Sequence, residues 1–98
     1  MELVFLPEAE QELSEAKNSY QAVAVELGRA FVDEADRILR QLAKFPHSGP
    51  PKFSCRRCVF LQFPYAMIYR SYADHILIVA ITHTSRRPGY WRPRLVKK

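Results

Sequence analysis

The residues best suited to chemistry are basic and aromatic side chains in the second half of the chain. Guanidinium groups bind phosphates through paired hydrogen bonds, and flat aromatic rings stack on unpaired bases, so this combination is typical of nucleic-acid binding. The alternative interpretation is a solvated basic face whose C-terminal end is anchored by Trp91. The set comprises Lys52, Arg56, Arg57, Arg70, Arg86, Arg87, Arg92 and Arg94, interleaved with Tyr65, Tyr90 and Trp91.

Some of these residues have the chemistry that RNA cleavage requires. Attack by a 2′-hydroxyl needs a base, an acid for the leaving oxygen, and cations for the charge on the phosphorane. His83 or Tyr90 could transfer protons, and Arg57, Arg86 or Arg87 could supply the cations. The alternative for each is structural, because a histidine at a strand end can bond backbone and a tyrosine beside a tryptophan can anchor packing.

Other enzyme classes gain no support from sequence motifs. The chain has no Gly-rich phosphate loop, no HExxH metal pair and no nucleophile motif. Cys55 and Cys58 form a single Cys-x-x-Cys pair, which could be half a zinc site or a redox pair. A structural zinc site needs four ligands, and if Cys58 lies in a strand, the spacing of three directs Cys55 to the opposite face unless the strand begins after it. We therefore expect ordinary strand-end residues, with no metal and no cofactor.

Charge is distributed unevenly along the 98 residues, whose net charge is +5. Before Gly49 five basic residues face nine acidic ones, whereas from Pro50 onward ten basic residues face Asp74 alone. The basic half predicts an anionic partner, either nucleic acid or an acidic protein segment. The sequence lacks an apolar run of the roughly 20 residues that span a membrane, and Met1-Glu2-Leu3 does not resemble a leader, so we expect a cytoplasmic protein.

The elements that must position these residues are strands. Residues 56 to 83 contain three apolar runs rich in β-branched and aromatic residues, separated by Pro64 and by Asp74-His75. Their short links allow only an antiparallel meander, because a parallel pair needs a crossover of a dozen or more residues. A further short strand is expected over 2–6, ending at Pro7.

Two amphipathic helices are expected between the first strand and the meander. The first follows Pro7, with apolar residues at positions 9, 13, 16 and 20 and with positions 11, 12, 15 and 18 away from that stripe. The second carries apolar residues at 27, 31, 35, 38, 42 and 45 and ends at Pro46. Gly28 is the only hint of a break, and whether residues 23–28 form a turn or a kink stays open, but a helical hairpin is favoured.

The predicted fold class is therefore α+β, a helical hairpin packed on an antiparallel sheet in the order β-α-α-β-β-β. We expect a single domain over residues 1–98, with 84–98 a basic aromatic C-terminal tail and not a core element.

The order of these elements and three sequence motifs resemble the RelE/ParE superfamily of bacterial toxins over essentially the whole chain. The motifs are Phe63-Pro64-Tyr65 followed by Ile68-Tyr69-Arg70, then Ala80-Ile81-Thr82-His83, then Arg86-Arg87-Pro88-Gly89-Tyr90-Trp91. The resemblance implies a small α/β toxin of a type II toxin–antitoxin pair. It also implies a cognate antitoxin, often with an acidic toxin-binding segment.

The superfamily divides by target, and the two branches imply different roles for the basic residues. RelE-like members cleave mRNA on the ribosome with lysines, arginines and a C-terminal tyrosine. In that branch Arg57, Arg86 and Tyr90 would be catalytic, with His83, Lys52 and Arg87 secondary, although the paired lysines of that branch are reduced here to Lys52. ParE-like members inhibit DNA gyrase and need no catalytic set.

The Phe63-Pro64-Tyr65 strand pair and the segment 73–83 favour the ParE-like branch, and a RelE-like endoribonuclease is the alternative. The residues expected to bind the target or the antitoxin are Arg56, Arg57, Arg70, Arg86, Arg87, Tyr90, Trp91, Arg92 and Arg94.

Overall fold

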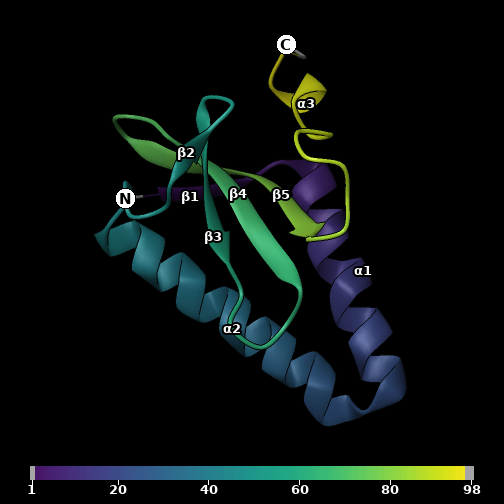
Figure 1. Cartoon of the computed structure of the whole chain (residues 1–98). Coiled ribbons are helices and arrows are strands. Elements are labelled where there is room, and N and C mark those ends of the chain that lie inside the picture. Colours follow the sequence, from purple (N-terminus) through teal and green to yellow (C-terminus); the bar gives the residue numbers. More distant parts are fainter. Residues whose placement is uncertain (1, 97–98) are drawn as a thin grey trace.

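The computed structural model describes residues 2–96 and consists of two long helices, a five-stranded sheet and a C-terminal segment (Figure 1). The elements, in chain order, are β1 (Glu2–Phe5), α1 (Pro7–Val23), α2 (Val25–Lys44), β2 (Pro51–Lys52), β3 (Cys55–Val59), β4 (Tyr65–Ser71), β5 (His75–His83) and α3 (Pro93–Val96). Met1, named in the expectation for the N-terminus, and Lys97 and Lys98, which end the predicted tail, lie outside the described residues. Within residues 2–96, no helix is long and apolar enough to cross a membrane.

The helical hairpin is confirmed, but its turn is not at Gly28. Pro7 occupies the first turn of α1, where a missing N–H costs nothing. The helices are separated by Ala24 alone, whose backbone is extended (φ −160°, ψ 138°). Gly28 lies inside α2, and a Cβ there would come within 2.8 Å of the Cβ of Gln21 on α1. The glycine therefore lets the two helices approach closely. From its sequence position alone, this role cannot be distinguished from that of a glycine that ends a helix.

The sheet is mixed, with strand order β1-β5-β4-β3-β2. The predicted antiparallel meander is confirmed for β3, β4 and β5. β1 instead pairs parallel to β5, with Leu3 opposite Ile76. The two helices and three further strands that lie between β1 and β5 in the chain provide the long connection that parallel pairing requires. The short β2, which pairs antiparallel to β3, was not predicted as a strand.

Both long helices pack their apolar stripes on one face of the sheet. Phe31, Ile38 and Leu42 of α2 are fully buried against Met67 and Ile78 of the central strands. The predicted stripe fails only at its ends, because residues 27 and 45 extend past the sheet and are exposed. The helical layer leaves the opposite face of β3, β4 and β5 for the C-terminal segment.

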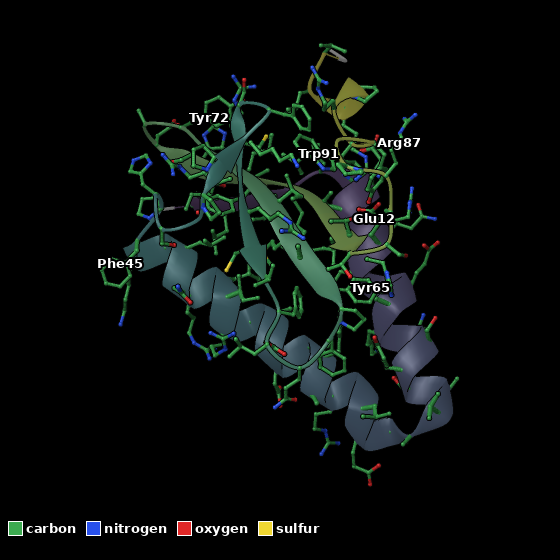
Figure 2. The ribbon with its side chains drawn as sticks, viewed as in Figure 1. Glu12, Phe45, Tyr65, Tyr72, Arg87 and Trp91 are labelled. Atoms are coloured by element: carbon green, nitrogen blue, oxygen red, sulfur yellow. The ribbon has the colours of Figure 1, made fainter. Side chains whose placement is uncertain are left out.

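The C-terminal segment, residues 84–96, closes that opposite face, so the expectation of a tail outside the core is wrong. Trp91 is 4% exposed and belongs to a second apolar cluster with Cys55, Ile68 and Val79. Figure 2 places Trp91 toward the sheet and Arg87 on the outer side of the segment. A large aromatic side chain covers much apolar surface, so one tryptophan can fix a chain that has little regular structure of its own.

Candidate functional site

A pocket of about 160 Å³ lies between the open face of the sheet and the C-terminal segment. Its walls come from the β2–β3 hairpin, the end of β5 and residues 84–91. Most of the side chains singled out in the sequence meet here: Lys52, Arg56, Arg57, His83, Arg86, Arg87, Tyr90 and Trp91. Arg70, Arg92 and Arg94 do not line it, and Tyr65 lies on the far side of His83, with ring centroids 5.1 Å apart.

Arg57 and Arg87 are the cations of the pocket whose guanidinium groups are unengaged. Strand alternation directs Arg57 to the same side as Cys55, the side that the C-terminal segment covers. Arg87 lies at the outer edge of that segment (Figure 2). Within residues 2–96, neither guanidinium makes a hydrogen bond, an ion pair or an aromatic contact. Both are therefore available to a ligand.

Two other arginines stack on aromatic rings, which fixes their planes. The guanidinium of Arg86 lies 3.8 Å from the centre of the Tyr90 ring, and that of Arg92 lies 4.4 Å from the centre of the Phe53 ring. Such stacking contributes about 0.5–1 kcal/mol at exposed sites and leaves the N–H edge of the guanidinium free to donate. Arg70 stacks at 5.5 Å on Tyr72, beyond the lining of the pocket.

Arg56 lines the pocket but also stabilises the preceding loop. Its Nη1 donates to the carbonyl oxygens of His47 (3.2 Å) and Gly49 (2.7 Å). The backbone N–H of Gly49 in turn donates to Oη of Tyr69 at 3.0 Å. Arg56 is thus partly committed to the fold, in contrast to Arg57.

The β2–β3 hairpin presents Phe53 to the C-terminal segment through an uncommon backbone. Phe53 and Ser54 both have left-handed φ values, 54° and 67°, as the two central residues of a tight hairpin of this kind require. Gly89 lies opposite with φ 79°, and a Cβ at Gly89 would come within 2.9 Å of the Phe53 ring. Glycine is needed there both for its conformation and for the close approach of the two walls.

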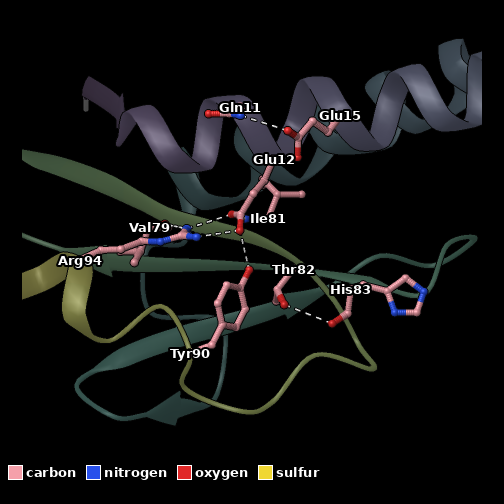
Figure 3. Close-up of polar contacts among 9 residues, drawn as sticks. All are labelled: Gln11, Glu12, Glu15, Val79, Ile81, Thr82, His83, Tyr90 and Arg94. Atoms are coloured by element: carbon pink, nitrogen blue, oxygen red, sulfur yellow. Dashed lines mark hydrogen bonds and ion pairs between the residues drawn. The ribbon is translucent and has the colours of Figure 1, made fainter.

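Glu12 of α1 holds the C-terminal segment in place, and sequence reasoning missed this role. Its carboxylate accepts hydrogen bonds from Tyr90 Oη (2.6 Å), from both terminal nitrogens of Arg94 (2.8 and 2.9 Å) and from the backbone N–H of Ile81 (3.0 Å), as Figure 3 shows. Arg94 also donates to the carbonyl of Val79 at 2.9 Å. Three segments are thereby joined at one carboxylate: α1, β5 and the C-terminal segment.

The pKa values of these groups follow from the contacts. Burial alone would raise the pKa of Glu12, but the hydrogen bonds from Arg94, Tyr90 and the Ile81 N–H together lower it. Burial, then the hydrogen bond to Glu12, raises the pKa of Tyr90. The hydrogen bond to Glu12 raises the pKa of Arg94. At neutral pH the ion pair is therefore fully charged and Tyr90 is protonated.

Arg94 consequently has an internal role that the sequence did not predict, and Trp91 has the anchoring role that was the alternative interpretation of the C-terminal end. Both were expected to contact the target or the antitoxin. The ion pair leaves the Arg94 side chain 15% exposed, and Trp91 packs into the second cluster. Nothing in the sequence around Glu12 distinguishes it from the other glutamates of α1. Its partners become apparent only in the folded structure.

His83 lines the pocket and has one ring nitrogen engaged. Its Nδ1 accepts from the backbone N–H of Ser85 at 3.0 Å and lies 2.7 Å from Oγ of the same serine. The predicted structural contact with backbone is thus present, and His83 also reaches the pocket wall beside Arg86.

The cysteine pair lies on opposite faces of β3, as its spacing predicts. Cys55 belongs to the cluster under the C-terminal segment and Cys58 packs against the helical layer. Both thiols are free, and burial raises the pKa of each. In the part of the chain that the structure describes, no three His, Cys, Asp or Glu side chains gather as a metal site would need.

Comparison with known proteins gives a family and a structural neighbour. A family model described as "ParE toxin of type II toxin-antitoxin system, parDE" matches residues 3–88. A solved structure titled "Chromosomal ParDE TA system from P. aeruginosa" is similar with a TM-score of 0.63 and 17% sequence identity, covering 85% of this chain and 95% of that chain. At this identity the neighbour shows the fold alone. No curated protein matches the chain.

Proposed function

Because the chain belongs to the ParE toxin family of type II toxin–antitoxin systems, we propose that it is a toxin that inhibits DNA gyrase in the cytoplasm and that an acidic antitoxin segment neutralises it. Gyrase inhibition is the activity that the ParE-like branch implies, and it requires binding but no proton transfer by the toxin. The observation that carries this choice is the position of the Tyr90 hydroxyl, which donates to Glu12.

A tyrosine acting in RNA cleavage must exchange a proton with the substrate near neutral pH. The hydroxyl of Tyr90 instead donates to Glu12, and burial and this bond raise its pKa further from neutrality. Lys52, moreover, is the only lysine of the pocket. These features support an inhibitory binding protein over an enzyme.

The lining of the pocket supports an acidic partner. Five basic side chains, those of Lys52, Arg56, Arg57, Arg86 and Arg87, line it and no carboxylate does. An acidic antitoxin segment placed over this surface would have complementary charge, which raises the association rate and disfavours wrong partners.

A RelE-like ribonuclease remains the second candidate because of one observation, the position of His83. It shares the pocket with Arg57 and Arg86, so a base and two cations lie within one concave site. In this mechanism His83, and not Tyr90, would have to take the proton of the 2′-hydroxyl.

Two assays on the purified toxin separate these functions. We expect loss of gyrase supercoiling, with mRNA intact in a translating ribosome extract. Cleaved mRNA together with normal supercoiling would establish the ribonuclease. If neither effect occurs, the domain binds an anion or an acidic partner without poisoning either target.

His83→Asn is the informative variant for both assays, because the Oδ1 of asparagine takes the place of Nδ1 and can still accept from Ser85, but the amide cannot act as a base at neutral pH. Gyrase inhibition should persist in this variant. A ribonuclease that depends on His83 should lose about 10²- to 10⁴-fold in cleavage rate, the usual contribution of a general base.

A further inference from the structure

We propose that the pocket between the sheet and the C-terminal segment binds a backbone phosphate of a nucleic acid strand. The inference concerns the isolated toxin and does not depend on gyrase being its target. It starts from Arg57 and Arg87, whose guanidinium groups are unengaged and which line one cavity, Arg57 from β3 and Arg87 from the rim formed by the C-terminal segment. Two guanidinium groups that line the same cavity can both donate to one phosphate, whose oxygens accept hydrogen bonds from several directions.

The other cations of the cavity also favour the binding of a polyanionic ligand. Arg86 lines the same cavity with its plane fixed by stacking on Tyr90, and Lys52 lies on the opposite side. No acidic side chain lines the cavity to neutralise them. Clustering like charges in a concave site costs free energy in the absence of a ligand, and an anion relieves that repulsion.

The cavity is held open by the fold and does not need a ligand to form. Glu12 fixes the C-terminal wall through Tyr90, and the Phe53 hairpin fixes the other wall opposite Gly89. A preformed site avoids the ordering cost that a mobile arginine cluster would pay on binding. The volume of about 160 Å³ suits one phosphate group with part of its sugar.

A phosphate is favoured over a carboxylate by the other donors of the cavity. The exposed Thr84 lines it beside the arginines and carries a hydroxyl donor, whereas the buried hydroxyl of Thr82 already donates to the carbonyl of His83. Phosphate and sugar oxygens of nucleic acids are commonly bound by such mixtures of arginine and hydroxyl donors. The ring of Phe53 at the rim holds the guanidinium of Arg92 at 4.4 Å and the ammonium of Lys52 at 5.6 Å from its centre, which places both cations near the anion.

The test is fluorescence anisotropy of a labelled 15-nucleotide oligothymidine, titrated with the purified toxin at several salt concentrations. Arg57→Gln and Arg87→Gln should each weaken binding about tenfold or more, the usual effect of losing a charge-assisted hydrogen bond. Each should also make the dependence of log K on log salt shallower by about 0.7, the value per contacted phosphate of a single strand.

Arg40→Gln is the matched control, because Arg40 is an exposed arginine of α2 in the helical layer and its loss gives the same charge change. It should change affinity less than twofold. Equal weakening by Arg40→Gln would overturn the proposal in favour of diffuse charge attraction, as would failure of the oligonucleotide to bind.

Four further ligands establish the chemistry of the site. An oligothymidine with uncharged methylphosphonate linkages should bind at least tenfold more weakly, and thymidine monophosphate should compete at high concentration. Polyglutamate that competes as well as the oligonucleotide, with the same dependence on Arg57 and Arg87, would overturn the assignment and make the pocket a site for acidic peptides. Competition by inorganic phosphate without any binding of the oligonucleotide would overturn the assignment to a nucleic acid strand.

Discussion

Replacing Glu12 should destabilise the whole domain, although Glu12 is one of several glutamates on α1. Glu12→Ala removes the acceptor for Tyr90, Arg94 and the Ile81 N–H at once. Breaking a buried ion pair from one side costs about 3–5 kcal/mol, and the 15% exposure of both side chains puts the expected loss near the lower end, about 3 kcal/mol. Glu12→Gln keeps an acceptor oxygen but loses the charge, so about 1–2 kcal/mol is expected.

Urea unfolding followed by tryptophan fluorescence measures this loss directly, because Trp91 is the only tryptophan and lies in the cluster that the segment forms. With an m-value of about 1–3 kcal/mol/M, a loss of about 3 kcal/mol lowers the midpoint by about 1–3 M. Glu10→Gln is the control, since Glu10 is exposed on the same helix, and it should stay within about 0.5 kcal/mol of the parent protein.

The pH dependence provides a second readout of the same contact. The fold lowers the pKa of Glu12, so its ionised form stabilises the protein above the pKa of an unfolded glutamate, about 4.3, and this contribution is lost as the pH falls through the lower folded value. The difference between the parent protein and Glu12→Gln should therefore be largest at neutral pH and shrink below about pH 4. A difference that is absent at pH 7, or that does not change on acidification, would refute the role assigned to this carboxylate.

Three further predictions concern the fold around the site. Gly28→Ala should destabilise by about 1–2 kcal/mol in urea unfolding, because crowding against Gln21 outweighs the gain in helix propensity of about 1 kcal/mol; a more stable variant would contradict the close helix contact. Tyr69→Phe should cost about 1–2 kcal/mol in the same assay, since it leaves the N–H of Gly49 without its acceptor, and an unchanged midpoint would argue against that bond. Cys55 should react with iodoacetamide far more slowly in the native protein than in urea, as mass spectrometry of the labelled peptide can measure, because burial excludes the reagent and raises the thiol pKa; equal rates would contradict its burial.

The parts of the fold that local patterns encode could be predicted from the sequence. The apolar runs in residues 56–83 indicate strands and the stripe through Phe31 and Ile38 indicates the buried side of the second helix, and both predictions are confirmed. The pairing of β1 with β5 joins residues about 73 positions apart, as in the register Leu3 with Ile76, and no local signal specifies it. Gly28 illustrates the same limit of prediction from sequence. A glycine that permits close helix packing and a glycine that ends a helix are the same residue type, so the sequence does not tell the two roles apart.

The basic site was predicted as a list of residues, and the structure divides that list by what each guanidinium contacts. Sequence composition counts Arg57 and Arg94 alike, yet Arg57 is unengaged and Arg94 is bound to Glu12. The difference arises from tertiary neighbours: strand β3 directs Arg57 into a cavity without acids, whereas Arg94 follows a buried tryptophan that brings it against α1. Charge alone therefore overestimates the surface that a partner can use.

This division also determines which experiments can test function. Truncation after His83 removes the basic aromatic residues, but it also removes Trp91 from an apolar cluster and both side-chain donors from Glu12. Leaving that carboxylate partly buried without its cation is costly, so a truncated protein would lose toxicity through unfolding whatever its target. Single substitutions at Arg57 and Arg87 avoid this problem, because neither guanidinium makes a hydrogen bond, an ion pair or an aromatic contact within residues 2–96. Loss of activity in those variants, with an unchanged urea midpoint, reports on the surface that meets the partner and not on the fold that presents it.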